Sequence, residues 1–271
     1  MFNLLIFAIL GWLTGVIINH LANILPLKET PFQQPFCKRR LNFTGQEFIS
    51  TATKGEDAAE APSYCHAPRP PIAWSGLLAY LGGNQHCSTC GKTLGLRSLA
   101  IEIFTPILFV FLYQHYTLSV YLLFALLYTA ILLLLTVTDL EHRLIQNVVI
   151  LPSLLLAFIG GFYSPYFSWK QAVLGGAIGF VVFYVLALLA RGGLGSGDVT
   201  LAAFLGLITG FPNIILVVVY GMLLGGIISA ALLITRRATM KTFIPYGPFL
   251  IITGWVALVW GESLGKMVWG G

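Results

Sequence analysis

Eight apolar stretches, most of them near 20 residues long, constrain this chain more than any other feature. They fall at about 2–25, 99–114, 119–138, 147–163, 170–190, 199–211, 214–235 and 245–261. About 20 apolar residues cross a bilayer as a helix, and continuous apolar runs do not fit the alternating pattern of a barrel strand. Only 9% of the residues are charged, whereas soluble domains carry about 25%. The sequence therefore predicts an all-α polytopic protein with about eight transmembrane helices in a lipid bilayer.

The polar residues concentrate between the first two apolar stretches. We therefore expect three parts: a first transmembrane helix at 1–25, a cysteine-containing loop at 26–98 and a transmembrane core at 99–271. The first stretch lacks a basic n-region and a small-residue cleavage site, which favours a retained helix over a cleaved signal peptide.

The basic residues orient this arrangement. With the N-terminus outside, 13 of the 15 Lys and Arg residues face the cytoplasm, and only Lys170 and Lys266 lie outside. Cytoplasmic loops of membrane proteins carry such an excess. The net charge of +5 is then explained by topology, and no nucleic-acid partner is expected.

Two of the three aspartates lie at the ends of apolar stretches. Asp139 follows LLYTAILLLLTVT, and Asp198 ends RGGLGSGD. Ionisable groups near hydrocarbon are costly and mark functional sites. Two adjacent carboxylates share a proton, so one can activate water while the other polarises a peptide carbonyl. The alternatives are structural: Asp139 paired with Arg143 or capping a helix, and Asp198 as the N-cap of a helix starting at Val199.

Five segments, in order, resemble the prepilin peptidase family. GSGDVTLAA is similar to its glycine-x-glycine-aspartate motif, and DLEHRLIQN to its first aspartate segment, with Gln146 where proline is usual. Three further segments resemble the end of the family's first span, its second cysteine pair and the start of its last span: GVIINHLANILP, HCSTCGKTLGLRSLAIEIFTPILF and IPYGPFL. The resemblance covers nearly the whole chain except about 38–62.

This resemblance implies a membrane aspartic endopeptidase with Asp139 and Asp198 as the catalytic pair. Such enzymes cleave the basic leader of type IV prepilins or type II secretion pseudopilins at the cytoplasmic face of the bacterial inner membrane. Many members then N-methylate the new N-terminus with S-adenosylmethionine, although no residue here can be assigned to that step. Association with the pilus or secretion assembly machinery is a further expectation.

The four cysteines of the chain all lie in the polar segment: Cys37, Cys65, Cys87 and Cys90. CSTC has zinc-knuckle spacing, and thiolates in the reducing cytoplasm can form a closed structural site. The family usually carries two CxxC pairs, but SYCHAP has Pro68 where the partner of Cys65 would stand. We therefore predict a structural Zn²⁺ ion, with Cys37 as the fourth ligand and His66 or His86 as alternatives.

Two other classes of protein remain open at this point. An ion- or proton-coupled transporter would use the two aspartates as a relay near the membrane midplane, often with repeat symmetry, and no repeat is visible here. An inactive membrane scaffold with a zinc module would tolerate loss of either aspartate. Glu102, near the start of the second apolar stretch, either pairs with Arg97 at the membrane interface or takes part in the chemistry.

Overall fold

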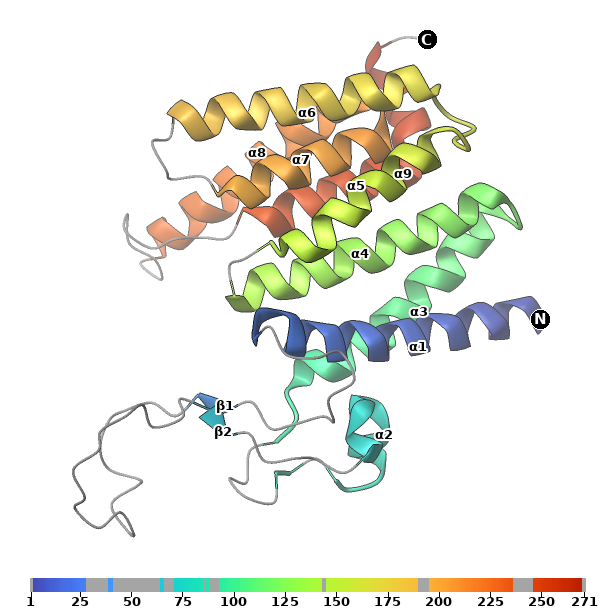
Figure 1. The fold of residues 1–271 in the computed structure, drawn as a ribbon, viewed down its shortest axis with the longest axis vertical. Helices are drawn as coiled ribbons and strands as arrows, with labels where there is room; N and C mark the ends of the chain where they lie inside the picture. The colour runs from blue at the N-terminus through green and yellow to red at the C-terminus, as the bar shows by residue number, and fades with distance from the viewer. Residues whose placement is uncertain are drawn as a thin grey trace. The chain divides into compact units, whose positions relative to one another are not determined.

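Helices dominate the computed structural model (Figure 1). It describes residues 2–27, 39–40, 64–65, 71–84, 86–87, 93–142, 145–189, 195–235 and 246–269. The α-helices are α1 (Phe2–Ile24), α2 (Gly76–Leu81), α3 (Leu96–Tyr116), α4 (Val120–His142), α5 (Asn147–Gly161), α6 (Trp169–Leu189), α7 (Ser196–Thr209), α8 (Asn213–Ile234) and α9 (Gly247–Trp269). The smaller elements are the 3-10 turns η1 (Leu25–Leu27) and η2 (Pro71–Trp74) and the antiparallel strands β1 (Arg39–Arg40) and β2 (Tyr64–Cys65).

Each predicted apolar stretch forms a helix, namely α1 and α3 to α9, which confirms the all-α polytopic architecture. Within the described residues, six of them are long and apolar enough to cross a membrane: α1, α3, α4, α6, α8 and α9. The two others, α5 and α7, are apolar but have only 15 and 14 residues. The number of spans therefore stays a prediction.

The last helix is longer than the sequence pattern predicted. It continues past residue 261 to Trp269, and in this extension Glu262 and Lys266 lie one turn apart and form an ion pair of 2.6 Å. Pairs of opposite charge at this spacing support a helix. The charges that end the apolar pattern therefore do not end the helix.

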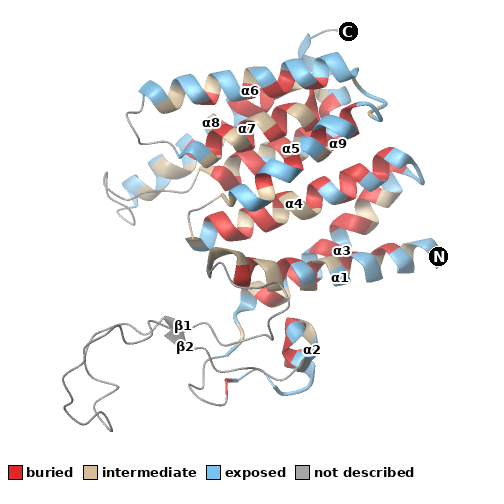
Figure 2. Ribbon diagram, viewed as in Figure 1, coloured by how far each residue is buried: buried red, intermediate tan, exposed pale blue. Residues whose placement is uncertain are grey.

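Large apolar side chains stay exposed on the outer faces of the helices. Figure 2 shows exposed residues along α6, and these include Phe180, Tyr184 and Leu188. Contiguous apolar surface of this kind is rare on soluble monomers. It suits helices surrounded by lipid, where the backbone is satisfied within each helix.

The chain divides into two compact units, residues 1–11 with 105–271 and residues 12–104. In the larger unit α6 and α7 approach closely through small residues. A Cβ atom added at Gly175 or Gly179 would collide with the backbone carbonyl of Gly206 or Ala202. Small residues allow membrane helices to pack backbone against backbone, and here they fix the helix that carries Asp198.

In the smaller unit, the carboxylate of Glu102 joins three helices. The side chain is 1% exposed. Its Oε1 accepts from the backbone N–H of Gly76 at 2.7 Å and from Asn19 Nδ2 at 3.2 Å. Its Oε2 accepts from Ser75 Oγ at 2.5 Å and from the backbone N–H of Leu77 at 3.1 Å. The first turn of α2 is thus held against α1 and α3 by a buried anion.

The sequence left open whether Glu102 pairs with Arg97 or takes part in the chemistry, and the structure surrounds its carboxylate with donors from α1 and the start of α2. The N–H groups at the start of a helix have no partner within that helix, and α2 directs two of them at the carboxylate. Arg97 donates through Nη2 to Asn23 Oδ1 at 2.8 Å.

Candidate active site

The two aspartates come from helix ends in the larger unit. Asp139 lies in the last turn of α4 and is 6% exposed, and Asp198 lies in the first turn of α7 and is 9% exposed. The interpretation of Asp198 as an N-cap is wrong, because Gly195 occupies the N-cap position. Asp198 is the third helical residue, and its carboxylate interacts with the backbone N–H of Gly195. This is one half of a capping box.

The carboxyl groups of Asp139 and Asp198 are close enough for their charges to interact directly. The sequence placed both at one depth, and the structure brings the end of α4 and the start of α7 together. Arg143, the alternative partner of Asp139, lies outside the described residues. The Oδ2 atom of Asp139 is buried and has no hydrogen-bond partner within the described part of the chain.

The start of α9 closes one side of this pair. The backbone N–H of Gly247 is directed at the carboxyl group of Asp139. A Cβ atom at Gly247 would lie 2.5 Å from Asp139 Oδ2, well inside van der Waals contact. Glycine is the residue that lets a backbone approach another group so closely. Gly247 therefore positions the carboxyl group of Asp139.

The residue before α9, Tyr246, lies near the other aspartate. Burial, followed by the charge of Asp198, raises the pKa of the Tyr246 hydroxyl. The phenol therefore stays protonated and can donate a hydrogen bond beside the pair. The Cβ atom that an alanine would add at Gly225 of α8 would lie 2.7 Å from the Tyr246 ring. The Tyr246 ring therefore packs against a glycine of the neighbouring helix.

The second glycine of GSGD makes room for the segment that follows α4. A Cβ atom at Gly197 would lie 2.8 Å from the Cβ atom of Ile145. By contrast, a Cβ atom at Gly195 would meet Asp198 Oδ2 at 3.6 Å, an ordinary contact. The two glycines thus serve different purposes: Gly195 offers an N–H to the aspartate, and Gly197 lets α7 lie against the chain that leaves Asp139.

Sequence reasoning identified the two aspartates but missed Ile145, Tyr246 and Gly247 as their neighbours. The IPYGPFL segment was singled out only as a resemblance. Its tyrosine-glycine pair, just ahead of an apolar stretch, could have suggested a close backbone approach. Which group it approaches requires the tertiary structure, because Gly247 is 108 positions beyond Asp139 in the chain.

Most of the predicted zinc ligands cannot be compared with the structure. Cys37, Cys90 and the alternative ligand His66 lie outside the described residues, and of Cys65 only the backbone is described. Cys87 is buried. Among the described residues, no three His, Cys, Asp or Glu side chains lie close enough together to hold a metal ion.

Comparison with known proteins identifies relatives of this chain. Residues 126–230, which include both aspartates, match the type IV leader peptidase family. The chain is 29% identical over 263 residues to the prepilin leader peptidase/N-methyltransferase of Pseudomonas aeruginosa, covering 94% of this chain and 90% of that protein. It is 31% identical over 199 residues to the protein of the same name from Pseudomonas putida, covering 71% and 69%. No solved structure matches the chain.

The fold and the paired carboxylates define a polytopic membrane protein with an acidic site at one end of its helices. The identity to the Pseudomonas putida relative over more than two thirds of both chains then fixes the family. The chain belongs to the type IV leader peptidase family.

Proposed function

We propose that this chain is a membrane aspartic endopeptidase that removes the leader from type IV prepilins or related pseudopilins. The observation that carries the proposal is the buried, interacting pair Asp139 and Asp198 in a chain of this family. The relatives that match most of the chain are prepilin leader peptidases with N-methyltransferase activity in their names. A transporter or an inactive scaffold would not cleave a prepilin.

The reaction needs only the groups at this site. One carboxylate of the pair takes a proton from water while the hydroxide formed attacks the carbonyl carbon of the scissile peptide. The protonated partner donates to the carbonyl oxygen, and the Tyr246 hydroxyl adds a donor nearby. When the tetrahedral intermediate collapses, the carbon–nitrogen bond breaks and the amine leaves with a proton from the pair. As the new carboxyl group forms, a hydroxyl group of the intermediate returns its proton to the pair, and the two aspartates again share one proton.

The test is leader cleavage by the purified protein in detergent, with a prepilin as substrate and intact mass as the readout. Asp139→Asn and Asp198→Asn should each lower the rate by about 1000-fold or more, because Asn cannot exchange a proton. Asp57→Asn removes the third aspartate and should cleave normally. Normal processing by Asp139→Asn or Asp198→Asn would refute the aspartic mechanism.

Methylation of the new N-terminus is the second activity that we propose. It would use S-adenosylmethionine as methyl donor, as the names of the relatives imply for those proteins. We assign no residues to it. The same mass assay, repeated with S-adenosylmethionine, should add one methyl group to the cleaved product, and Asp139→Asn given precleaved pilin should still add it.

We also propose that 26–98 and the aspartate pair face the cytoplasm of a bacterial inner membrane, with α9 ending outside. The support is the uneven distribution of Lys and Arg. Cys87 is buried, so accessibility is better tested with cysteines placed at exposed positions. In a background without native cysteines, an impermeant thiol reagent should label Lys266→Cys but not Asn84→Cys in intact cells. The reverse pattern would invert the topology.

For the cysteines we propose a structural Zn²⁺ ion held by Cys37, Cys65, Cys87 and Cys90. Two observations fit this donor set. Strand pairing sets Arg39, two residues after Cys37, opposite Cys65, and a bridge pairs His86 with Thr93, which stand before and after the CSTC pair in the sequence. The ion would tie these segments together and would take no part in peptide cleavage.

Elemental analysis tests this site. Protein purified without chelator should carry about one zinc ion per chain. Cys37→Ser should lower zinc retention. Unchanged retention would exclude Cys37 as a ligand and leave His66 or His86 as the fourth.

A further inference from the structure

A second site lies in the larger unit, at the other end of the helices from the aspartates. It is a cavity of about 210 Å³ that draws its walls from the ends of α3, α4, α7 and α8, from the middle of α9 and from the loop between α5 and α6. Tyr121, near the start of α4, lines it, whereas Asp139 lies near the end of the same helix. The 18 residues between them span about 27 Å at 1.5 Å each. The cavity is therefore separate from the cleavage site.

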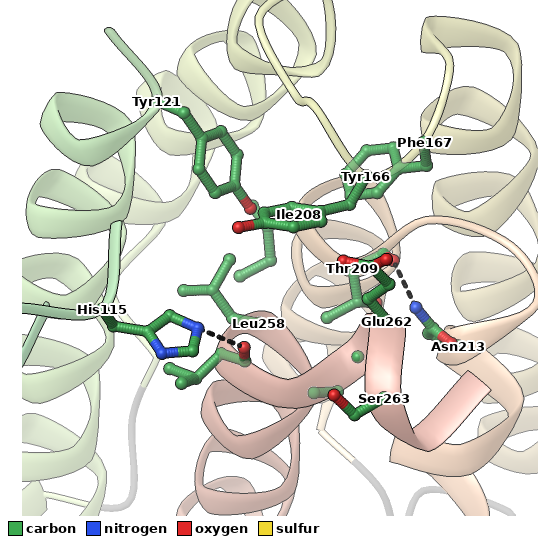
Figure 3. A pocket seen from close by; sticks show the side chains of 13 residues that line it. His115, Tyr121, Tyr166, Phe167, Ile208, Thr209, Asn213, Leu258, Glu262 and Ser263 are labelled. Atoms are coloured by element: carbon green, nitrogen blue, oxygen red, sulfur yellow. Dashed lines mark hydrogen bonds between the residues drawn. The ribbon is translucent and has the colours of Figure 1, made fainter. Parts of the chain in front are cut away.

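Aromatic rings form one side of this cavity. Tyr121 and Tyr166 pack edge to face with ring centroids 5.5 Å apart, and Tyr116 lies against both, at 5.1 and 6.0 Å. Figure 3 shows the Tyr121 and Tyr166 side chains above the hollow, with His115 beside Leu258 of α9. The His115 ring already has a hydrogen-bond partner, because its Nε2 lies 3.1 Å from the carbonyl oxygen of Val259.

One acidic side chain lies among the described residues that line the cavity. Glu262 is the carboxylate in its lining, and no Lys or Arg is among the described residues that line it. Thr209 at the end of α7 and Asn213 at the start of α8 both line the cavity, so helix ends of opposite polarity meet there and the lining carboxylate is the group that distinguishes a cation. Burial, and then the charge of Glu262, raise the pKa of Tyr166, and its ring therefore stays a neutral phenol.

The carboxylate of Glu262 already binds one ammonium group, that of Lys266. Lys266 is outside the lining, and its ammonium group lies 2.6 Å from Glu262 Oε1. Both side chains of this pair are about half exposed or more, at 64% and 49%, so the pair is weak and exchangeable. An ammonium group that entered the cavity would meet the same carboxylate together with the tyrosines that line it.

We propose that this cavity binds the ammonium group of a membrane lipid headgroup, such as that of phosphatidylethanolamine. Aromatic faces and a carboxylate are the two groups that recognise an organic ammonium ion. The volume corresponds to about seven water molecules at 30 Å³ each, which suits a small organic headgroup rather than a bare metal ion. Aromatic residues at the ends of membrane helices lie at headgroup level, so a lipid can reach the cavity from the bilayer.

Native mass spectrometry of the detergent-purified protein tests the proposal. The probes are phosphatidylethanolamine and phosphatidylglycerol with the same acyl chains. Wild-type protein should retain the ethanolamine lipid about fivefold better, because phosphatidylglycerol has no ammonium group. Glu262→Gln should abolish this preference. Tyr220→Leu, which removes an exposed tyrosine of α8 outside the cavity lining, should leave it unchanged.

A second variant keeps the test decisive if Glu262→Gln fails to fold. Ser263→Lys places an ammonium group in the cavity lining and should also abolish the lipid preference. Equal retention of both lipids by wild-type protein, or a preference that survives in the folded Glu262→Gln and Ser263→Lys variants, would overturn the proposal. We expect free ethanolamine not to displace the lipid. Displacement at millimolar ethanolamine would overturn the assignment to a lipid and point to a soluble amine.

Discussion

The chain buries carboxyl groups in two ways, and the contrast separates structure from chemistry. Glu102 accepts four hydrogen bonds, two at each oxygen. Asp139 is also buried, but its Oδ2 has no hydrogen-bond partner among the described residues, and the nearby charged group is another carboxylate, Asp198. A buried anion costs little only when donors surround it. Glu102 meets that condition and holds helices together, whereas each aspartate interacts with a single backbone N–H, and in the proposed function this pair performs the cleavage.

The largest expected difference follows from replacing each carboxylate by its carboxamide. Asp139→Asn should lose about 1000-fold in leader cleavage while its unfolding midpoint stays the same or rises, because the change removes one charge of a repelling pair. Thermal unfolding in detergent and the cleavage assay measure the two effects on one preparation. A clear drop in the unfolding midpoint of Asp139→Asn would mean that this carboxylate, like Glu102, is structural.

The opposite result is expected for Glu102→Gln. The amide nitrogen would face N–H donors, so at least one of Gly76 and Leu77 loses its acceptor. This should cost about 3 kcal/mol of stability, while cleavage per folded molecule stays near the wild-type value. Denaturant unfolding followed by circular dichroism measures this loss of stability.

Glu141→Gln is the matched control, because Glu141 lies near the exposed end of α4 and its loss should change stability little. A cleavage defect in folded Glu102→Gln protein would place Glu102 in the chemistry.

The aspartate pair could be predicted from the sequence and the hydrogen-bond partners of Glu102 could not, and the difference has a physical reason. The aspartates could be predicted because a charge at the end of an apolar stretch is costly and rare. The eight helices could be predicted because each is continuously apolar. The partners of Glu102 could not, because Ser75 and Asn19 are 27 and 83 positions away in the chain. Their use depends on where α2 begins, and nothing in a helix of six residues gives a strong periodic signal.

The next effect tests how closely α9 must approach Asp139. Gly247→Ala places a Cβ atom 2.5 Å from Asp139 Oδ2, so the carboxyl group has to rotate away from Asp198. Misplacement on this scale can cost about 100-fold in rate. We expect kcat to fall by about 10- to 100-fold with little change in KM, because substrate binding is untouched.

Gly226→Ala is the control for this substitution. Gly226 is also a helical glycine, and a Cβ atom there meets no other atom within 4 Å. Its activity should equal wild type, with a small gain in stability from the better helix former. If Gly247→Ala cleaves as fast as Gly226→Ala, the geometry of the pair does not depend on α9.

The smallest effect distinguishes the two glycines of GSGD. Gly197→Ala brings a new Cβ atom 2.8 Å from the Cβ atom of Ile145, so the start of α7 must shift, and we expect kcat to fall about tenfold. Gly195→Ala adds only an ordinary contact at 3.6 Å with Asp198. Its φ of −72° suits any residue, so its rate should stay within about twofold of wild type.

A second substitution identifies the cause of the Gly197→Ala defect. Ile145→Ala shortens the side chain but keeps its Cβ atom, so it should not rescue Gly197→Ala. Ile145→Gly removes that atom and should restore part of the lost rate in the double variant. Kinetics of the single and double variants give the coupling between the two positions. If Ile145→Ala restores the rate as completely as Ile145→Gly does, the contact between the two Cβ atoms is not the cause of the Gly197→Ala defect. The role assigned to Gly197 would then be wrong, and the proposal for the aspartate pair would be unaffected.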